Sequence, residues 1–290
     1  MKPITDPTPW QDRWRQLKLA HCAVPGYGTP GEFWSDRKNV QTVYMKGRER
    51  HREQTEHRLA AMQVSDGARV LDIGAGPGTY AIPLASRGCS VTVVEPSPIM
   101  REAMDEQLSR SPALDITVIP KRWEDVTIDE VGAPFNIVLA SYSLTMVDIG
   151  SAVSKMRNCC EGWIHLFWFL TSPPWVRVNR DLWPLLHGGT YPGQPTADWL
   201  WQCLIEMGIY ANLSVETKFP PPVFDSVEAA VSDYRVRLNC TTEAQVETVR
   251  NYFTQVLRRS DAGYVLDGET LGAHIWWQES PASATGGYVR

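Results

Sequence analysis

The stretch VLDIGAGPGTY, residues 70–80, decides the fold of this chain. It opens with an apolar run that is typical of a buried β-strand. Gly74, Gly76 and Gly78 follow at alternate positions, and the next residues have the composition of a helix that ends near Gly88. Because glycine has no Cβ, a strand, a glycine turn and a helix N-terminus together let a ligand approach the backbone closely.

The glycine spacing and the acid before it indicate the kind of ligand. Dinucleotide-binding turns have the spacing G-x-G-x-x-G, whereas this chain has G-x-G-x-G with Thr79 at the last position of the longer pattern. Asp72 lies just before the turn, where its carboxylate would repel a pyrophosphate and suit a cationic group. S-adenosylmethionine carries an ammonium and a sulfonium and no phosphate. The alternative is a dehydrogenase-type turn or an unrelated glycine turn.

VLDIGAGPG resembles motif I of the Rossmann-like (class I) S-adenosylmethionine-dependent methyltransferases. The resemblance extends through residues 60–170 in the order and spacing of motifs and is weaker over residues 200–280. It implies S-adenosylmethionine as cofactor and S-adenosylhomocysteine as product. The cofactor-binding residues that it implies in this stretch are Asp72, Gly74, Ala75, Gly76 and Gly78.

Composition limits the other classes of function. The chain has 290 residues, enough for one large domain or a domain with a cap. A net charge of -5 argues against a broad phosphate-binding surface, so a nucleic-acid partner is not expected. The start of the chain has no apolar core of a signal peptide, and the longest apolar run, residues 163–170, is too short to span a membrane. We therefore expect no membrane association.

The cysteines and tryptophans carry two further expectations. The six cysteines include no C-x-x-C pair, and Cys159 and Cys160 are adjacent. This pattern predicts reduced thiols in a cytoplasmic protein and no metal site. Twelve tryptophans favour an aromatic-lined pocket beside ordinary core packing.

From residue 68 onward, strand-like and helix-like segments alternate. This alternation predicts an α/β fold with a doubly wound, mostly parallel seven-stranded sheet and helices on both faces. Ligands are then expected at the edge formed by the carboxyl ends of the strands. The predicted strands cover residues 69–73, 90–95, 115–119, 135–140, 163–170, 211–224 and 268–279.

The predicted organisation has three parts. Residues 1–60 form an N-terminal helical cap, residues 61–280 form the Rossmann-like methyltransferase domain, and residues 281–290 form a flexible tail. Residues 171–200 and 225–265 are helical or Pro-, Gly- and Trp-rich insertions in the C-terminal half, which we expect to cover the substrate. The Trp-rich segment is equally suited to form a homodimer interface.

The sequence also makes more specific predictions for these parts. In the cap, Trp10, Trp14 and Leu17 share one helix face, and Ser35 is expected to cap a helix that runs from Asp36. The charged stretch at residues 46–59 is interpreted as a solvated helix face with i,i+4 ion pairs. In the second insertion, helices are predicted over residues 226–239 and 241–260.

The end of the second predicted strand adds the strongest support for the cofactor. Glu95 lies 17 residues after Gly78. In this fold an acid at that point accepts hydrogen bonds from both hydroxyls of a ribose. The alternative is an exposed glutamate at a strand end. The segment VTVVEPSPIM also resembles the family's next motif, which implies that Pro96, Ser97 and Met100 lie beside the adenine.

The loop after the third predicted strand is KRWEDV, residues 121–126. In the family, an acid in this loop accepts from the adenine amino group and a backbone N–H meets a ring nitrogen. The acid is Glu124 or Asp125, because Arg122 occupies the position where many relatives have it. Trp123 would supply the backbone N–H and stack on the purine. An ordinary charged surface loop is the alternative.

Two further regions are expected to border the methionine half of the cofactor. Ser141 and Tyr142 follow the fourth predicted strand, where the family's loop passes the transferred methyl group. Segments before the first strand often lie over the cofactor in the family, which makes Trp34 and Tyr44 the aromatic candidates. Packing of these side chains onto the core is the alternative in each case.

The resemblance implies a methyltransferase that acts on a small-molecule acceptor. Methyl transfer from a sulfonium is an in-line displacement in which positioning supplies much of the catalysis. A general base is needed only where the acceptor loses a proton, and the candidates are His187, Tyr142 and Tyr191. His165, within an apolar strand, is interpreted as a core histidine. The alternatives are an RNA or protein methyltransferase, an aminopropyltransferase, and a cofactor-binding fold relative with a regulatory, non-catalytic role.

Overall fold

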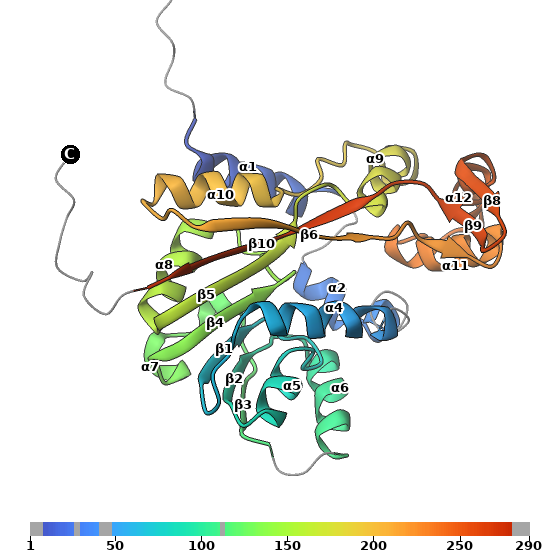
Figure 1. Cartoon of the computed structure of the whole chain (residues 1–290). Coiled ribbons are helices and arrows are strands. Elements are labelled where there is room, and N and C mark those ends of the chain that lie inside the picture. Colours follow the sequence, from blue (N-terminus) through green and yellow to red (C-terminus); the bar gives the residue numbers. More distant parts are fainter. Residues whose placement is uncertain (1–7, 26–29, 41–47, 111–113, 280–290) are drawn as a thin grey trace, which may run out of the picture.

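The computed structural model describes residues 8–25, 30–40, 48–110 and 114–279, and a sheet of seven strands forms its centre (Figure 1). The strand order is β3-β2-β1-β4-β5-β10-β6. The first five strands pair in parallel, and β10 is antiparallel to both of its neighbours. The predicted doubly wound, mostly parallel sheet is therefore confirmed. The strands are β1 (Arg69–Ile73), β2 (Ser90–Val94), β3 (Ile116–Ile119), β4 (Phe135–Ser141), β5 (Cys160–Phe169), β6 (Asn212–Phe219) and β10 (Thr270–Gln278).

Helices cover both faces of this sheet, because the central strands bury side chains on both sides. In β1, Leu71 and Val70 are both fully buried, and they belong to two different cores. One core packs under α1 (Trp10–Cys22), α7 (Ile128–Val131), α8 (Ile149–Cys159) and α10 (Ala197–Glu206). The other core packs under α4 (Arg48–Ala61), α5 (Ala81–Ser86) and α6 (Pro98–Leu108).

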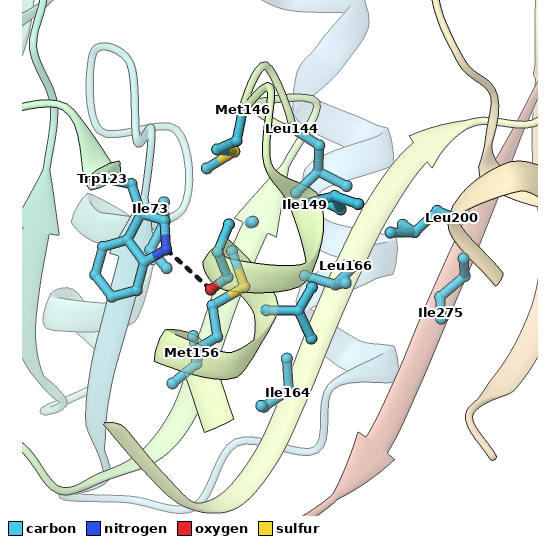
Figure 2. Close-up of a cluster of buried hydrophobic side chains, with 14 of the residues drawn as sticks. Ile73, Trp123, Leu144, Met146, Ile149, Met156, Ile164, Leu166, Leu200 and Ile275 are labelled. Atoms are coloured by element: carbon cyan, nitrogen blue, oxygen red, sulfur yellow. Dashed lines mark hydrogen bonds between the residues drawn. The ribbon is translucent and has the colours of Figure 1, made fainter. Parts of the chain in front are cut away.

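The first core includes bulky aromatic and sulfur-containing side chains, among them Trp123, Met146 and Met156 (Figure 2). Trp14 of α1 is fully buried in it, and its indole N–H donates to the carbonyl of Met146 at 2.9 Å. The expected apolar face of the first helix is thus confirmed at Trp14. Among the described residues, every helix is too short or too polar to cross a lipid bilayer.

A second, smaller unit lies beside the main sheet, at the right of Figure 1, where most of its elements are orange. It has its own apolar core, which includes Val178, Leu238 and Phe253. Its helices are α9 (Pro174–His187), α11 (Val227–Arg237) and α12 (Glu243–Val256). A three-stranded sheet of β7 (Val223–Phe224), β9 (Gly263–Leu266) and β8 (Leu257–Ser260) completes it. We call these elements the helical unit.

Two predicted boundaries are wrong in the helical unit and the cap. The helix predicted over residues 241–260 ends at Val256, because residues 257–260 pair antiparallel with β9. The predicted cap Ser35 instead ends α2 (Pro30–Ser35). Asp36 caps the next helix, α3 (Arg37–Asn39), and its carboxylate accepts from the backbone N–H groups of Lys38 and Asn39 at 2.8 and 3.1 Å. Aspartate is a strong N-cap because its side chain satisfies these free donors.

The Pro-rich segment after β5 is more regular than its composition suggests. Pro173 precedes α9 and Pro174 is its first residue. Proline suits this position, because the first residues of a helix have no intrahelical acceptor for their N–H groups. Residues 171–200 therefore contain a helix of 14 residues rather than a continuous loop.

Candidate functional site

The glycine turn leaves β1 at the carboxyl edge of the sheet. Each of its three positions favours glycine for a different physical reason. All three have positive φ, namely +70° at Gly74, +57° at Gly76 and +81° at Gly78. A Cβ on Gly74 would lie 2.4 Å from Cβ of Ser143, and a Cβ on Gly78 would lie 2.9 Å from Ile82. A Cβ on Gly76 would meet only the sulfur of Met100, at 4.0 Å. The space above Gly76 is therefore the open side of the turn, where a ligand can approach the backbone.

This difference gives a stability prediction for Gly74→Ala, with Gly88→Ala as matched control. Both residues have positive φ, at +70° and +87°, but a Cβ on Gly88 would have no atom within 4 Å. Left-handed backbone costs a non-glycine residue about 1–2 kcal/mol, which is the effect expected for Gly88→Ala. The contact with Ser143 should add about 1–3 kcal/mol for Gly74→Ala. Urea denaturation measures both, and equal effects would contradict this account of the turn.

Glu95 follows β2 and is held by the backbone of the site. It is 6 % exposed. One carboxylate oxygen accepts from the N–H of Gly76 at 2.8 Å, and the other accepts from the N–H of Ser97 at 2.8 Å. Each oxygen can accept a further hydrogen bond. Burial raises the pKa of Glu95, and the two backbone donors act in the opposite direction. The carboxylate is thus fixed beside the open face of Gly76, where a diol can reach it.

Asp72, in β1, is the buried acid of the site. It is 1 % exposed, and its oxygen Oδ2 has no hydrogen-bond partner among the described residues. Burial, and secondarily the charge of Glu95, raise the pKa of Asp72 to about 8. A buried carboxylate with an unsatisfied oxygen is costly unless a cation or a donor reaches it. These residues fit a ligand that places a cationic group near Asp72 and a hydroxyl pair near Glu95.

The helix after Glu95 connects the site to the cap. Ser97 caps α6 by accepting from the N–H of Met100 at 3.1 Å. Its hydroxyl also donates to the backbone carbonyl of Trp34 at 2.6 Å. The structure thereby brings α2 of the cap next to the predicted adenine neighbours. Pro96 is exposed and Met100 is buried, and their placement beside the adenine remains a prediction.

The loop after β3 forms a 3-10 turn at Trp123–Asp125. The ring of Trp123 is only 3 % exposed, and its indole N–H donates to the carbonyl of Ala152 at 3.2 Å (Figure 2). The predicted stacking of this ring on a purine is therefore wrong, because the ring is part of the core under α8. Its backbone N–H remains a predicted contact.

The two candidate acids of that loop differ in their partners. Glu124 accepts from the guanidinium of Arg122 at 2.7 Å, whereas Asp125 is exposed. Lys155 of α8 donates to the carbonyls of Trp123, Glu124 and Val126 at 2.5, 3.2 and 2.8 Å. Lys155 thus anchors the loop to α8. Glu124 and Asp125 both remain candidates for the contact with the adenine amino group.

Tyr142 and Ser141 end β4 beside a buried polar network. The hydroxyl of Tyr142 accepts from Arg58 at 3.1 Å, and Ser141 donates to the hydroxyl of Tyr80 at 3.2 Å. Arg58 also donates to the Tyr80 hydroxyl at 3.1 Å. Burial raises the pKa of Tyr142, so its hydroxyl stays protonated at neutral pH. Tyr142 is therefore a poor general base and is better suited to form part of the wall of the site.

The sequence reasoning missed the two charged members of this network. Arg58 of α4 and Glu216 of β6 form an ion pair of 2.7 Å, and the side chain of each is only 6 % exposed. The interpretation of residues 46–59 as a solvated face is wrong at Arg58. It holds at Glu56, which forms an exposed ion pair with Arg87. No local signal marks Arg58, because its partner lies 158 residues away.

The remaining candidates lie apart from the glycine turn. His187 is the last residue of α9, where its Nε2 donates to the carbonyl of Leu238 at 2.7 Å and its ring packs on Trp183. Tyr191 is buried in the core of the helical unit. These contacts place both residues in the helical unit. Tyr44 lies outside the described residues.

His165 is a core histidine, as the sequence predicted. It is 2 % exposed, and its Nδ1 lies 2.9 Å from Nε2 of His274. Burial, together with the neighbouring ring, lowers the pKa of His165 to about 3. Both rings are thus neutral at physiological pH and share one hydrogen bond.

Comparison with known proteins agrees with this geometry. A protein-family profile described as "Methyltransferase domain" matches residues 70–161. An uncharacterized protein of Haemophilus influenzae is 28% identical over 227 residues, which make up 76% of this chain and 79% of that protein. The matched profile begins at β1 and includes the glycine turn, Glu95 and β4.

Two solved structures show the same fold at low sequence identity. A putative methyltransferase from Bacillus halodurans is 12% identical with a TM-score of 0.53, covering 79% of this chain and 99% of that one. The plantazolicin methyltransferase BpumL, solved in complex with SAH, is 9% identical with a TM-score of 0.52, covering 93% and 99%. The profile match over residues 70–161 and the shared fold make this chain similar to the Rossmann-like (class I) S-adenosylmethionine-dependent methyltransferases.

Proposed function

We propose that this protein transfers a methyl group from S-adenosylmethionine to a small-molecule acceptor. The observation that carries the proposal is the pair of buried carboxylates at the ends of the adjacent strands β1 and β2. Asp72 has an oxygen without a partner, and Glu95 is fixed by two backbone donors beside Gly76. This arrangement suits a ligand with a cationic amino acid group at one end and a ribose in the middle.

The residues of the site take the following roles in this proposal. Asp72 accepts from the ammonium group of the cofactor, and Glu95 accepts from both ribose hydroxyls. Ala75 and the three glycines let the backbone approach the ligand. The adenine lies beside Pro96, Ser97 and Met100, with contacts from the backbone of Trp123 and from the carboxylate of Glu124 or Asp125. Ser141 and Tyr142 border the methionine half.

The chemistry needs little besides positioning. When bound, S-adenosylmethionine supplies a methyl group on a sulfonium, which departs as a neutral thioether after in-line attack by the acceptor. The contribution of this chain is to fix the direction of that attack. Arg58 holds the hydroxyl of Tyr142, whose ring packs on Phe169 with a centroid distance of 4.7 Å. Tyr142 thereby forms one wall of the path to the methyl group.

A small hollow at the end of β5 has room for about one water molecule. The acidic net charge weighs against RNA as the acceptor. The hollow lies between the main sheet and the helical unit, which serves as the cover in this proposal. It is lined by Trp168, Phe169, Trp175, Val176, Gln194 and Thr196, among others.

The compartment and the oligomeric state belong to the same proposal. All six cysteines are unpaired, which is usual for the reducing cytoplasm, where we place the enzyme. A homodimer through the Trp-rich segment remains a prediction, and light scattering of the purified protein tests it.

A turnover screen tests the proposed function. Purified protein is incubated with S-adenosylmethionine and separate pools of small aromatic molecules, total RNA and denatured protein, and the release of S-adenosylhomocysteine is measured. We expect release above background with a small-molecule pool. Release only with RNA or protein would contradict the acceptor class. Tight cofactor binding without turnover in any pool would favour the regulatory alternative.

A further inference from the structure

The residue that follows β4 has a backbone conformation that its neighbours must enforce. Tyr142 has a φ of +53°, a left-handed conformation that is uncommon for a bulky side chain. Its backbone N–H donates to the carbonyl of Phe167 in β5 at 2.9 Å. The hydroxyl of the next residue, Ser143, donates to the carbonyl of Ile73 at the end of β1, at 2.6 Å. Such strained residues persist where the surrounding structure fixes them, and they cluster at functional sites.

Gly272 of β10 provides the space in which the side chain of Tyr142 ends. A Cβ on Gly272 would lie 2.4 Å from the hydroxyl oxygen of Tyr142, well inside van der Waals contact. Unlike the glycines of the turn, Gly272 does not have a positive φ, so its backbone conformation would accept an alanine. The pairing of β10 with β6 shifts its register between Leu271 and Ala273, which is at this glycine. Glycine within a strand often marks such an irregularity or the close approach of another group.

The ring of Tyr142 is held on its other sides by two aromatic rings and a cation. It packs against Phe169 of β5 and Phe219 of β6, with centroid distances of 4.7 and 5.6 Å. Arg58 donates to its hydroxyl at 3.1 Å, and the guanidinium lies 5.0 Å from the ring centroid. The backbone of Tyr142 and its hydroxyl are therefore both fixed. The ring has one position relative to the glycine turn, and Gly272 is needed for it.

We propose that Gly272 is a positioning residue of the cofactor site. By leaving room for the hydroxyl of Tyr142, it sets where the ring of Tyr142 lies against the methionine half of S-adenosylmethionine. A side chain at position 272 would push the hydroxyl away from β10. Because the backbone of Tyr142 is held, the ring would tilt, and it would either enter the space of the methionine half or lose contact with it. Both displacements weaken binding. The inference rests on the proposed function, because it takes Tyr142 to border the methionine half.

Calorimetric titration with two ligands tests this inference. Adenosine has only the adenine and the ribose, whereas S-adenosylmethionine adds the methionine half. In Gly272→Ala we expect the affinity for S-adenosylmethionine to fall by about tenfold, as for a small-to-large change in a packed site, and the affinity for adenosine to stay unchanged. Tyr142→Phe removes the oxygen that the new Cβ would meet. Gly272→Ala combined with Tyr142→Phe should therefore bind S-adenosylmethionine as tightly as Tyr142→Phe alone.

Urea denaturation of the same proteins tests the steric pairing without any ligand. Gly272→Ala should lower the urea midpoint, and the decrease should be smaller when Tyr142→Phe is also present. Gly150→Ala is the matched control, because a Cβ on Gly150 would meet the side chain of Gln11, at 1.9 Å, instead of Tyr142. Its effect should be the same with and without Tyr142→Phe. Tyr142→Leu removes the ring without changing β10, and it should also weaken binding of S-adenosylmethionine while adenosine binding is kept.

The outcomes separate this inference from the proposed function. Native-like binding of S-adenosylmethionine by Gly272→Ala or by Tyr142→Leu would overturn the inference. A loss in Gly272→Ala that persists undiminished in the double variant would also overturn it, because the glycine would then not act through Tyr142. In these cases the native protein still binds the cofactor and the proposed function stands. If the native protein binds neither ligand, the proposed function fails and the inference fails with it.

Discussion

Replacing Arg58 with methionine should lower the free energy of unfolding by about 3–5 kcal/mol, because it leaves a buried carboxylate without its cation. The Nε of Arg58 lies 2.7 Å from Glu216, and the two other guanidinium nitrogens donate to Tyr80 and Tyr142. All three partners are lost together in the variant. The same change should also weaken binding at the site, because Tyr142 loses the donor that fixes its hydroxyl.

A double-mutant cycle separates the ion pair from the packing. Arg58→Met combined with Glu216→Leu removes both charges, and we expect this protein to recover most of the lost stability. Arg87→Met is the matched control, because its pair with Glu56 is exposed and should be worth about 1 kcal/mol or less. Guanidinium denaturation measures the native protein, the Arg58→Met and Glu216→Leu single variants, the double variant and the Arg87→Met control. A single variant at Arg58 that is as stable as the Arg87 variant would contradict a structural role for the buried pair.

Replacing Asp72 with asparagine should weaken S-adenosylmethionine binding by about 10- to 100-fold, since a hydrogen bond to a charged group is worth about 1.5–3 kcal/mol. The asparagine side chain has nearly the same shape and can still accept from the backbone, but it carries no charge for the ammonium group. Asp66→Asn is the control, because Asp66 is exposed just before β1. Calorimetric titration gives the affinities, and equal binding by both variants would contradict the assignment of Asp72.

The raised pKa of Asp72 adds a pH dependence to this prediction. With a folded-state pKa of about 8, Asp72 is protonated at neutral pH in the free protein. Binding a cation then requires release of that proton, so the affinity of the native protein should rise with pH up to about 8. The affinity of Asp72→Asn should lack this component, and the comparison of the two proteins cancels the titration of the ligand itself.

The same shift makes a separate prediction for stability. The folded-state pKa of Asp72 is above the value of about 4 in an unfolded chain. The folded state therefore binds the proton more tightly, and the free protein loses stability as the pH rises from about 4 to about 8. Asp72→Asn should not show this loss and should be the more stable protein at pH 8. A functional residue that costs stability is common in binding sites.

The sequence predicts the main sheet well because each strand is a local apolar run with a turn at its end. All seven strands are present, but the sixth, predicted over residues 211–224, ends at Phe219, and Val223–Phe224 forms β7 of the small sheet. The small sheet of the helical unit was missed for a physical reason. Residues 257–260 follow α12 without a glycine or proline, and only their pairing with β9 makes them a strand.

The sequence predicts the parts of the site that depend on local contacts. It does not predict the parts that depend on long-range contacts. The sequence predicts that Asp72, the glycines and Glu95 lie together, because the strand, turn and acid are adjacent in the chain or a fixed distance apart. The ring of Trp123 was misassigned because the sequence does not say which face of the loop α8 covers. Arg58 and Glu216 could not be paired, since their contact depends on how α4 packs against the last strand of the sheet.

The most direct test of the central claim is calorimetric titration of the purified protein with S-adenosylmethionine and with S-adenosylhomocysteine. We expect micromolar binding of both. In Glu95→Ala the affinity should fall by about 100-fold, since two charge-assisted hydrogen bonds to the ribose are removed. In Glu106→Ala, which changes an exposed acid of α6, it should be unchanged. Absence of binding by the native protein, or undiminished binding by Glu95→Ala, would contradict the account.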